Sequence, residues 1–159
     1  LQGSSMSDKT ISQEYANGLI FELEKAFWDE RGKGARFRVT TVGRELFRAE
    51  CLPRLQSTEI DDMIRGVESA LKDKGIVSQV SAARDGRLLR VRVEGCAHRA
   101  VEDRLVAQET KPFTCVPANL IVLAIEEKLD RPAELAEIKL EDGACHVLIV
   151  LFDQRPVLV

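Results

Sequence analysis

The sequence lacks the features that mark membrane, secreted and nucleic-acid-binding proteins. No apolar run reaches the roughly 18 residues that a membrane-spanning helix needs, and the N-terminal stretch LQGSSMSDKT has neither the basic nor the apolar region of a signal peptide. A net charge of -3 offers little attraction for a phosphate backbone, and no cluster of Lys and Arg compensates for it. We therefore expect a cytoplasmic protein with no membrane span and no nucleic-acid partner.

Cysteine and histidine are scarce, with four and two residues respectively among 159. The four cysteines are widely spaced, which is not typical of a disulfide scaffold and favours a reducing compartment. A phosphate-binding glycine loop is also missing, because the segment RGKGAR is not followed by a helix of the required kind.

What is present suits one globular domain. Hydrophobic residues make up 45% of the chain, enough to bury a sizeable core. We interpret residues 1–6 as a disordered, vector-derived tail in which Met6 marks the native start, and residues 7–159 as a single domain.

The spacing of apolar residues predicts four helices. The first spans residues 11–31, where apolar side chains recur at every fourth position. The second follows Ser57 or Thr58, either of which can cap it, and ends at Gly75. Residues 99–108 form the third, and Pro117 occupies the first turn of a fourth that is apolar around its axis and so should be buried. Residues 36–52 are ambiguous, with weak alternation over 36–41 and a short helix possible over 42–52, before Pro53. The apolar positions of the first two helices are Ile11, Tyr15, Leu19, Leu23 and Phe27, and then Ile60, Met63, Ile64, Val67 and Leu71.

Two segments predict β-hairpins. In IVSQVSAARDGRLLRVRVEG the turn is Asp85-Gly86, and in AELAEIKLEDGACHVLIVLFD it is Asp142-Gly143. The strand after the first turn alternates apolar and charged residues, so one face should meet water. Residues 145–152 are apolar on both faces, which predicts a central strand covered on both sides. The expected fold class is α+β: a single domain with a small antiparallel sheet of two hairpins packed against helices.

The cysteines and histidines offer a candidate zinc site. Cys96 and His98 follow the first hairpin, Cys115 precedes the fourth helix, and Cys145 opens the last strand. Together these four could supply the tetrahedral sulfur and nitrogen ligands that zinc takes, with His146 as an alternative to Cys145. The spacing is not that of a zinc finger, and buried cysteines often serve only as small apolar residues.

A reactive thiol is a second interpretation of the same residues. Cys115 precedes a helix whose free N–H groups and dipole would lower its pKa, and His98 could act as its base. Nothing in the sequence marks an oxyanion hole. The paired carboxylates Glu126-Glu127 and Asp61-Asp62 are read as solvated surface charge.

The C-terminal half resembles a known family. The segments LRVRVEGCAHR, PFTCVPANLIVLAIEEKL and AEIKLEDGACHVLIVLF are similar to the 4-vinyl reductase domain family, also called hydrocarbon-binding, whose fold is shared with Bet-three-type subunits of the transport protein particle. The resemblance covers about residues 80–153. It differs in the first turns of the fourth helix, which lack the family's glycines, and in a missing second cysteine near the end. The matching positions are Cys96, Cys115, Glu137, Gly143 and Cys145.

The resemblance implies an often dimeric domain that binds a small hydrophobic molecule, in sensing or as an accessory to tetrapyrrole or aromatic metabolism, and it favours a metal at the cysteines. Our hypothesis is a non-enzymatic binding or regulatory module with an apolar pocket between helices and sheet. Phe113, Leu120 and Leu123 flank the Cys115 turn and are the expected ligand contacts; no catalytic residue is assigned. Two alternatives stay open: a thiol enzyme using Cys115 with His98, and a homodimeric interaction subunit with the N-terminal helix at its seam.

Overall fold

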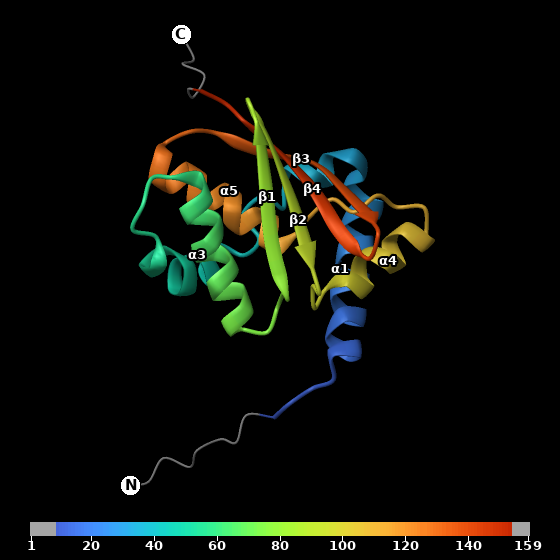
Figure 1. Cartoon of the computed structure of the whole chain (residues 1–159). Helices are drawn as coiled ribbons and strands as arrows, with labels where there is room; N and C mark the ends of the chain where they lie inside the picture. The colour runs from blue at the N-terminus through green and yellow to red at the C-terminus, as the bar shows by residue number, and fades with distance from the viewer. Residues whose placement is uncertain (1–8, 154–159) are drawn as a thin grey trace, which may run out of the picture.

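The computed structural model describes residues 9–153, so the interpretation of residues 1–6 lies outside the described chain. Within these residues, five α-helices and four strands form one α+β domain, as expected (Figure 1). The helices are α1 Gln13–Arg31, α2 Arg44–Leu46, α3 Ile60–Asp73, α4 Arg99–Ala107 and α5 Val116–Leu129, and the strands are β1 Gln79–Asp85, β2 Leu88–Glu94, β3 Ala133–Glu141 and β4 Ala144–Leu151.

The two hairpins join into one antiparallel sheet in the order β1-β2-β4-β3. Within the shared β2–β4 pair, Val91 lies opposite Val147 and Val93 opposite Cys145. Each hairpin follows a helix in the chain: α3 precedes β1–β2 and contacts β1, while α5 precedes β3–β4 and contacts β3. The chain therefore contains two successive units, each a helix followed by a hairpin.

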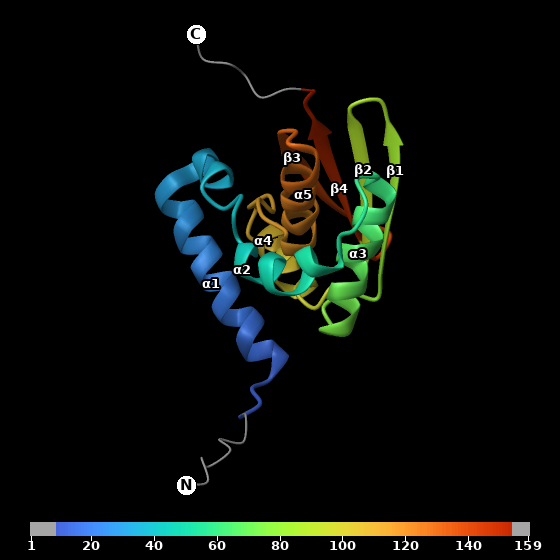
Figure 2. The ribbon, with the colours of Figure 1, turned by 90° about the vertical axis from the view of Figure 1, so that its left-hand side faces the viewer.

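Helices α3 and α5 cover one face of the sheet (Figures 1 and 2). All five apolar positions predicted for α3 are buried, and α5 is buried from Pro117 to Ile125. Both predictions are confirmed. The cap of α3 differs by one or two residues: Glu59 holds the N-cap position, and its backbone N–H donates to Ser57 Oγ at 3.0 Å.

Helix α1 buries a different face from the one that its spacing suggests. Ser12 caps it, and Asn17 and Phe21 are its buried residues. Among the residues spaced by four, only Phe27 is half-buried, whereas Tyr15 and Leu23 are exposed. Positions four apart drift by about 40° around a helix of 3.6 residues per turn, so five of them cannot share one buried face.

The ambiguous stretch contains no strand. Residues Gly32–Phe37 form a 3₁₀ turn (η1), and α2 continues as a π-helical turn at Phe47–Cys51 (η2) and a 3₁₀ turn at Leu52–Arg54 (η3). The short helix is therefore present but runs past Pro53, which sits in the first positions of the last turn, where its missing N–H costs nothing. The strand suggested by the alternation over residues 36–41 is absent, since these residues connect α1 to α2 and do not join the sheet.

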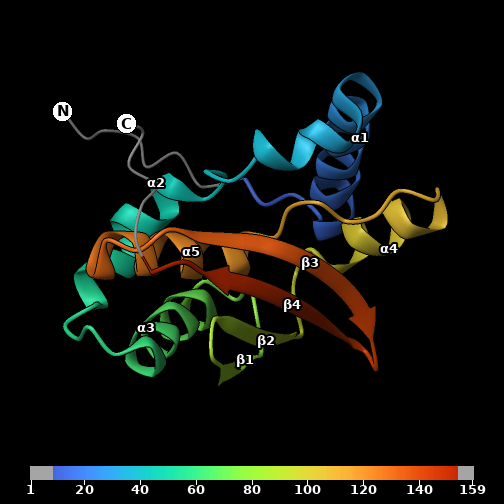
Figure 3. The same ribbon diagram turned by 90° about the horizontal axis from the view of Figure 1, so that it is seen from above.

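Strand β4 is central, as expected, but it is not covered on both sides. Cys145, Val147 and Ile149 are buried against the helices, whereas His146, Leu148 and Val150 on the other face are only half-buried. No helix of the described residues packs on that face (Figures 2 and 3). The apolar residues Leu148 and Val150 thus face partly to water, which a strand pattern alone cannot reveal.

The turn of the first hairpin is shifted by one residue from its expected position. Asp85 pairs with Leu88, which leaves Gly86 and Arg87 as the two-residue loop, with Gly86 at φ 59. In the second hairpin Asp142 and Gly143 form the turn, both with positive φ, as predicted.

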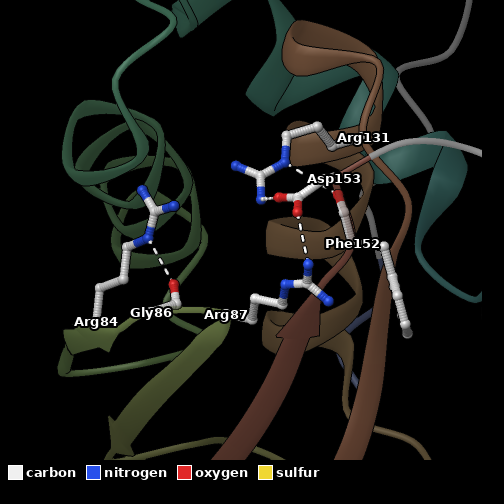
Figure 4. Close-up of polar contacts among 6 residues, drawn as sticks. All are labelled: Arg84, Gly86, Arg87, Arg131, Phe152 and Asp153. Atoms are coloured by element: carbon white, nitrogen blue, oxygen red, sulfur yellow. Dashed lines mark hydrogen bonds and ion pairs between the residues drawn. The ribbon is translucent and has the colours of Figure 1, made fainter.

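Hydrogen bonds and ion pairs among Arg87, Arg131 and Asp153 link the two hairpins (Figure 4). The carboxylate of Asp153, just beyond β4, accepts from Arg87 Nη2 at 2.7 Å and lies 3.3 Å from Arg131 Nη2. Arg131 Nε also donates to the carbonyl of Phe152 at 3.0 Å. These contacts connect the β1–β2 turn, the start of β3 and the end of β4.

Candidate functional site

A cavity of about 350 Å³ lies between α5, the segment of residues 36–44 and the start of β3. Of the expected ligand contacts, Phe113 and Leu123 line it. Leu120 does not, because its side chain is fully buried in the main core. The remaining wall is a mixture of apolar and polar side chains: Arg36, Phe37, Val39, Thr40, Thr41, Arg44, Asn119, Val122, Glu126, Pro132, Ala133, Glu134 and Leu135.

Asn119 holds the outer wall of this cavity in place. Its buried amide Nδ2 donates to the carbonyls of Val39 at 3.3 Å and Val42 at 3.0 Å, and to Thr114 Oγ1 at 3.1 Å. A buried amide is stable only when it is hydrogen-bonded, so this side chain fixes the 39–42 loop against α5. The loop was not part of the expected site. An asparagine inside the otherwise apolar stretch ANLIVLAI was the one signal that could have indicated it.

The close approach of the same loop to α5 depends on Gly43. Its φ is 102, and a Cβ at this position would lie 3.2 Å from Leu120 Cδ2. The mouth of the cavity is charged, with Arg36 and Arg44 from the loop and Glu126 from α5. The guanidinium of Arg36 also lies 4.9 Å from the ring centre of exposed Phe37. The cavity thus combines an apolar floor with a polar rim, an arrangement common to small-molecule sites.

The floor connects to a second, smaller core under α1. Phe113 packs there with Phe21, Val101 and Leu105. The single tryptophan, Trp28, lies with its ring centre 5.4 Å from that of Phe113. A change at the cavity floor therefore reaches an aromatic reporter directly.

The three cysteines of the expected site come near one another. Cys96 follows β2 and accepts the backbone N–H of His98 at 3.4 Å. Cys145 lies on β4 opposite Val93, and Cys115 is the N-cap residue of α5. The charge states of these thiols influence one another, and each is also influenced by Glu102. No pattern in the sequence indicated that Glu102 would lie among them.

His98 contacts helix α1 through Asn17. Its Nδ1 lies 3.2 Å from Asn17 Oδ1, and Asn17 Nδ2 donates to the carbonyl of Ala97 at 2.8 Å. Burial lowers the pKa of His98. Among residues 9–153, no group of three or more His, Cys, Asp or Glu side chains that could hold a metal ion is formed. The zinc site stays a prediction.

The prediction that the helix N-terminus lowers the pKa of Cys115 is wrong. The backbone N–H of Ala118 does favour the thiolate, but burial outweighs it and raises the pKa of Cys115 well above the ordinary value. Burial likewise raises the pKa of Cys145 to about 12. The helix N-terminus lowers a thiol pKa only where the sulfur remains solvated, and here it does not.

Two carboxyls with raised pKa values were missed altogether, buried Glu102 and half-buried Glu24. Glu102 on α4 is only 6% exposed, and its Oε2 has no hydrogen-bond partner. Burial, and then the charge of Glu24 on α1, raise the pKa of Glu102 to about 8, while burial raises that of Glu24 to about 7. Because such carboxyls look like surface charge in a sequence, only the packing of α1 on α4 reveals them.

Comparison with known proteins adds no identity: no protein-family model and no curated protein matches the chain. No helix within residues 9–153 is both long enough and apolar enough to cross a membrane.

Proposed function

We propose that this chain is a non-enzymatic module that binds a small hydrophobic molecule in the cavity beside α5. This function accords with the resemblance of residues 80–153 to the 4-vinyl reductase, or hydrocarbon-binding, family, and we propose membership of that family on the same grounds. The proposed setting is a reducing cytoplasm, since all four cysteines are free.

One observation carries the proposal: a cavity of about 350 Å³ with Phe113 and Leu123 in its wall. This volume falls at the lower end of the range typical of small-molecule sites, roughly 300–1,000 Å³. The raised pKa of Cys115 argues in the same direction, because a thiol nucleophile would need the opposite shift.

Trp28 fluorescence tests the proposal directly. We expect toluene, added as a small aromatic probe, to change the emission of Trp28 saturably, because Phe113 contacts both the tryptophan and the cavity. Thr40→Phe should block the response, since exposed Thr40 lines the cavity and a ring there would fill it, whereas Thr40→Ser should preserve it. A response that is absent, or equal in Thr40→Phe and the parent chain, contradicts the proposal.

A homodimeric interaction module is the second candidate, and one observation favours it. Tyr15, Leu19 and Leu23 on α1, and Ile11 just before it, are 47 to 66% exposed. Apolar side chains gathered on one surface commonly mark an interface. A two-fold contact through these residues would bury them in both copies.

Sedimentation velocity separates this candidate from a monomer. We expect a dimer whose dissociation constant rises at least about tenfold in the double variant Leu19→Glu, Leu23→Glu, because each charge would be desolvated at the seam. Val106→Glu is the matched control, since Val106 is also an exposed apolar residue but lies on α4. A parent chain that sediments as a monomer at every concentration removes the candidate.

The zinc hypothesis concerns Cys96, His98, Cys115 and Cys145 and is separate from ligand binding. Elemental analysis of the purified chain decides it. About one zinc per chain, lost in Cys96→Ser, supports a site that braces the loop after β2. Zinc far below that ratio in the parent chain removes the hypothesis and leaves the cavity proposal unchanged.

A further inference from the structure

The uncovered face of the sheet carries a hollow of its own. Its volume is about 420 Å³, and it shares no lining residue with the cavity beside α5. The face looks toward the viewer in Figure 1, where α5 passes behind the strands and α3 lies beside β1. The hollow is lined by Ser81, Ala82, Ala83, Arg90, Val91, Arg92, Glu137, Lys139, Glu141, His146, Val147 and Leu148.

Four polar residues form a straight row across this face. The register places Ser81 opposite Arg92, Arg92 opposite His146, and His146 opposite Lys139. The row therefore crosses all four strands in the order β1-β2-β4-β3. Directly opposite side chains in a sheet lie close enough to act on one ligand.

Two nitrogen atoms in the middle of the row lack partners. Arg92 Nε and His146 Nε2 are both shielded from water and make no hydrogen bond. Most buried polar atoms in folded proteins are hydrogen-bonded, so an orphaned pair requires an explanation. The Arg92 side chain as a whole is 42% exposed, and its Nη2 lies 3.1 Å from Glu94 Oε1. A small movement of its exposed end would admit a ligand to the row.

The chemistry of these atoms defines the missing partner. An arginine N–H can only donate, so the partner of Arg92 Nε must be an acceptor. Charge favours an anion: Arg90, Arg92 and Lys139 line the hollow against two carboxylates, Glu137 and Glu141. Lys139 lies 3.5 Å from Glu137, whereas Arg90 forms no ion pair within residues 9–153. Oxygens of an anion accept the strongest hydrogen bonds from such donors.

We propose that Arg92, His146 and Lys139 on the uncovered face of the sheet bind a small oxyanion, a carboxylate or phosphate group. The group lies across β2 and β4 and accepts from Arg92 Nε and from His146 Nε2 in its donor form. Leu148, next to His146 on the same face, offers apolar contact to the body of a ligand that carries the group.

The two histidines make the test self-controlled. NMR of the histidine rings gives two sets of signals, one from His146 in the row and one from His98, which lies outside the hollow and contacts Asn17. The variant His146→Asn assigns them. The probes are sodium phosphate and sodium succinate, each added at constant pH and compared with sodium chloride at equal ionic strength. We expect a saturable shift of the His146 signal while that of His98 stays in place.

The probes also distinguish the ligand classes. A response to phosphate alone assigns a phosphate group, a response to succinate alone assigns a carboxylate, and a response to both assigns the shared oxyanion chemistry. Equal shifts in sodium chloride, equal shifts of both histidines, or no shift with either probe overturn the proposal.

Variants locate the binding on the row. Arg92→Gln should weaken the affinity roughly tenfold, because it removes one charge-assisted donor. Arg84→Gln is the matched control: Arg84 lies in the same hairpin, but its Nε donates to the carbonyl of Gly86, outside the row. Lys139→Gln, at an exposed residue of β3, gives a second measurement of the affinity without a change in β2. Unchanged affinity in both row variants overturns the proposal, and this result would leave the Trp28 response to toluene untouched.

Discussion

At the scale of single residues, the glycines in the turns differ in how well they would accept a larger residue. Gly95, directly after β2, has a φ of 64, and a Cβ there would lie 1.9 Å from Ser78 Oγ. Gly86 has almost the same φ, 59, but open space around it. Alanine substitutions at these two glycines therefore separate the cost of backbone strain from the cost of steric overlap.

We expect Gly95→Ala to lower the free energy of unfolding by at least about 3 kcal/mol, since it combines a left-handed backbone with a direct clash. Gly86→Ala should cost only about 1 kcal/mol, because strain acts alone there. Urea denaturation measures both values. Equal costs in the two variants would show that the backbone at Ser78 moves away freely.

At the scale of elements, the contact between α1 and α4 should respond to pH. Glu24 and Glu102 face one another across it, with pKa values raised to about 7 and about 8. Below the ordinary carboxyl pKa both groups are neutral in the folded and unfolded chain. Between the ordinary carboxyl pKa of 4.5 and a pH of about 8, the unfolded chain ionises these two groups more readily than the folded chain does, so stability falls over this range and then levels off.

Glu102→Gln should remove most of this loss. At a pH of about 5 the variant and the parent should differ little, whereas at about pH 9 the variant should be more stable by roughly 2–4 kcal/mol. Urea denaturation at both pH values measures the difference. Glu22→Gln, on the exposed side of α1, is the control and should show no such gain. A parent chain as stable at about pH 9 as at about pH 5 would refute the buried pair.

At the scale of the whole molecule, the sheet is covered on one side only. Adjacent residues of β4 therefore belong to different environments: Ile149 is fully buried under α5, and Val150 lies on the uncovered face. One main core joins both hairpins with α3 and α5, which predicts a single cooperative unfolding transition.

Neighbouring truncations on β4 test this one-sided arrangement. Ile149→Ala should cost about 2–5 kcal/mol through the cavity it leaves, and Val150→Ala less than about 1.5 kcal/mol. Thermal unfolding of both variants, monitored by circular dichroism, gives the comparison. A cost for Val150→Ala as large as that for Ile149→Ala would mean that something covers the second face.

Much of the fold could be predicted where spacing and turn chemistry agree. The face of α3, the burial of α5 and the Asp142-Gly143 turn all follow from local pattern. The buried face of α1 could not be predicted, since Tyr15 and Leu23 are as apolar as core residues and only the position of α4 decides which side is covered.

The candidate sites divide in the same way. Phe113 and Leu123 could be picked out as neighbours of the Cys115 turn, but the opposite wall of their cavity comes from residues 36–44, far away in the chain. Arg92 and His146 become neighbours only through the pairing of β2 with β4.

The sequence by itself determined the α+β class, the two hairpins and the two helices that cover them, because these depend on local periodicity and turn residues. Tertiary structure alone decided which carboxyls became buried, as with Glu102, and which apolar residues stayed exposed, as with Leu19 and Leu23. The reason is physical: the dielectric environment and the hydrogen-bond partners of a side chain are set by what packs against it, and that is not encoded in its neighbours along the chain.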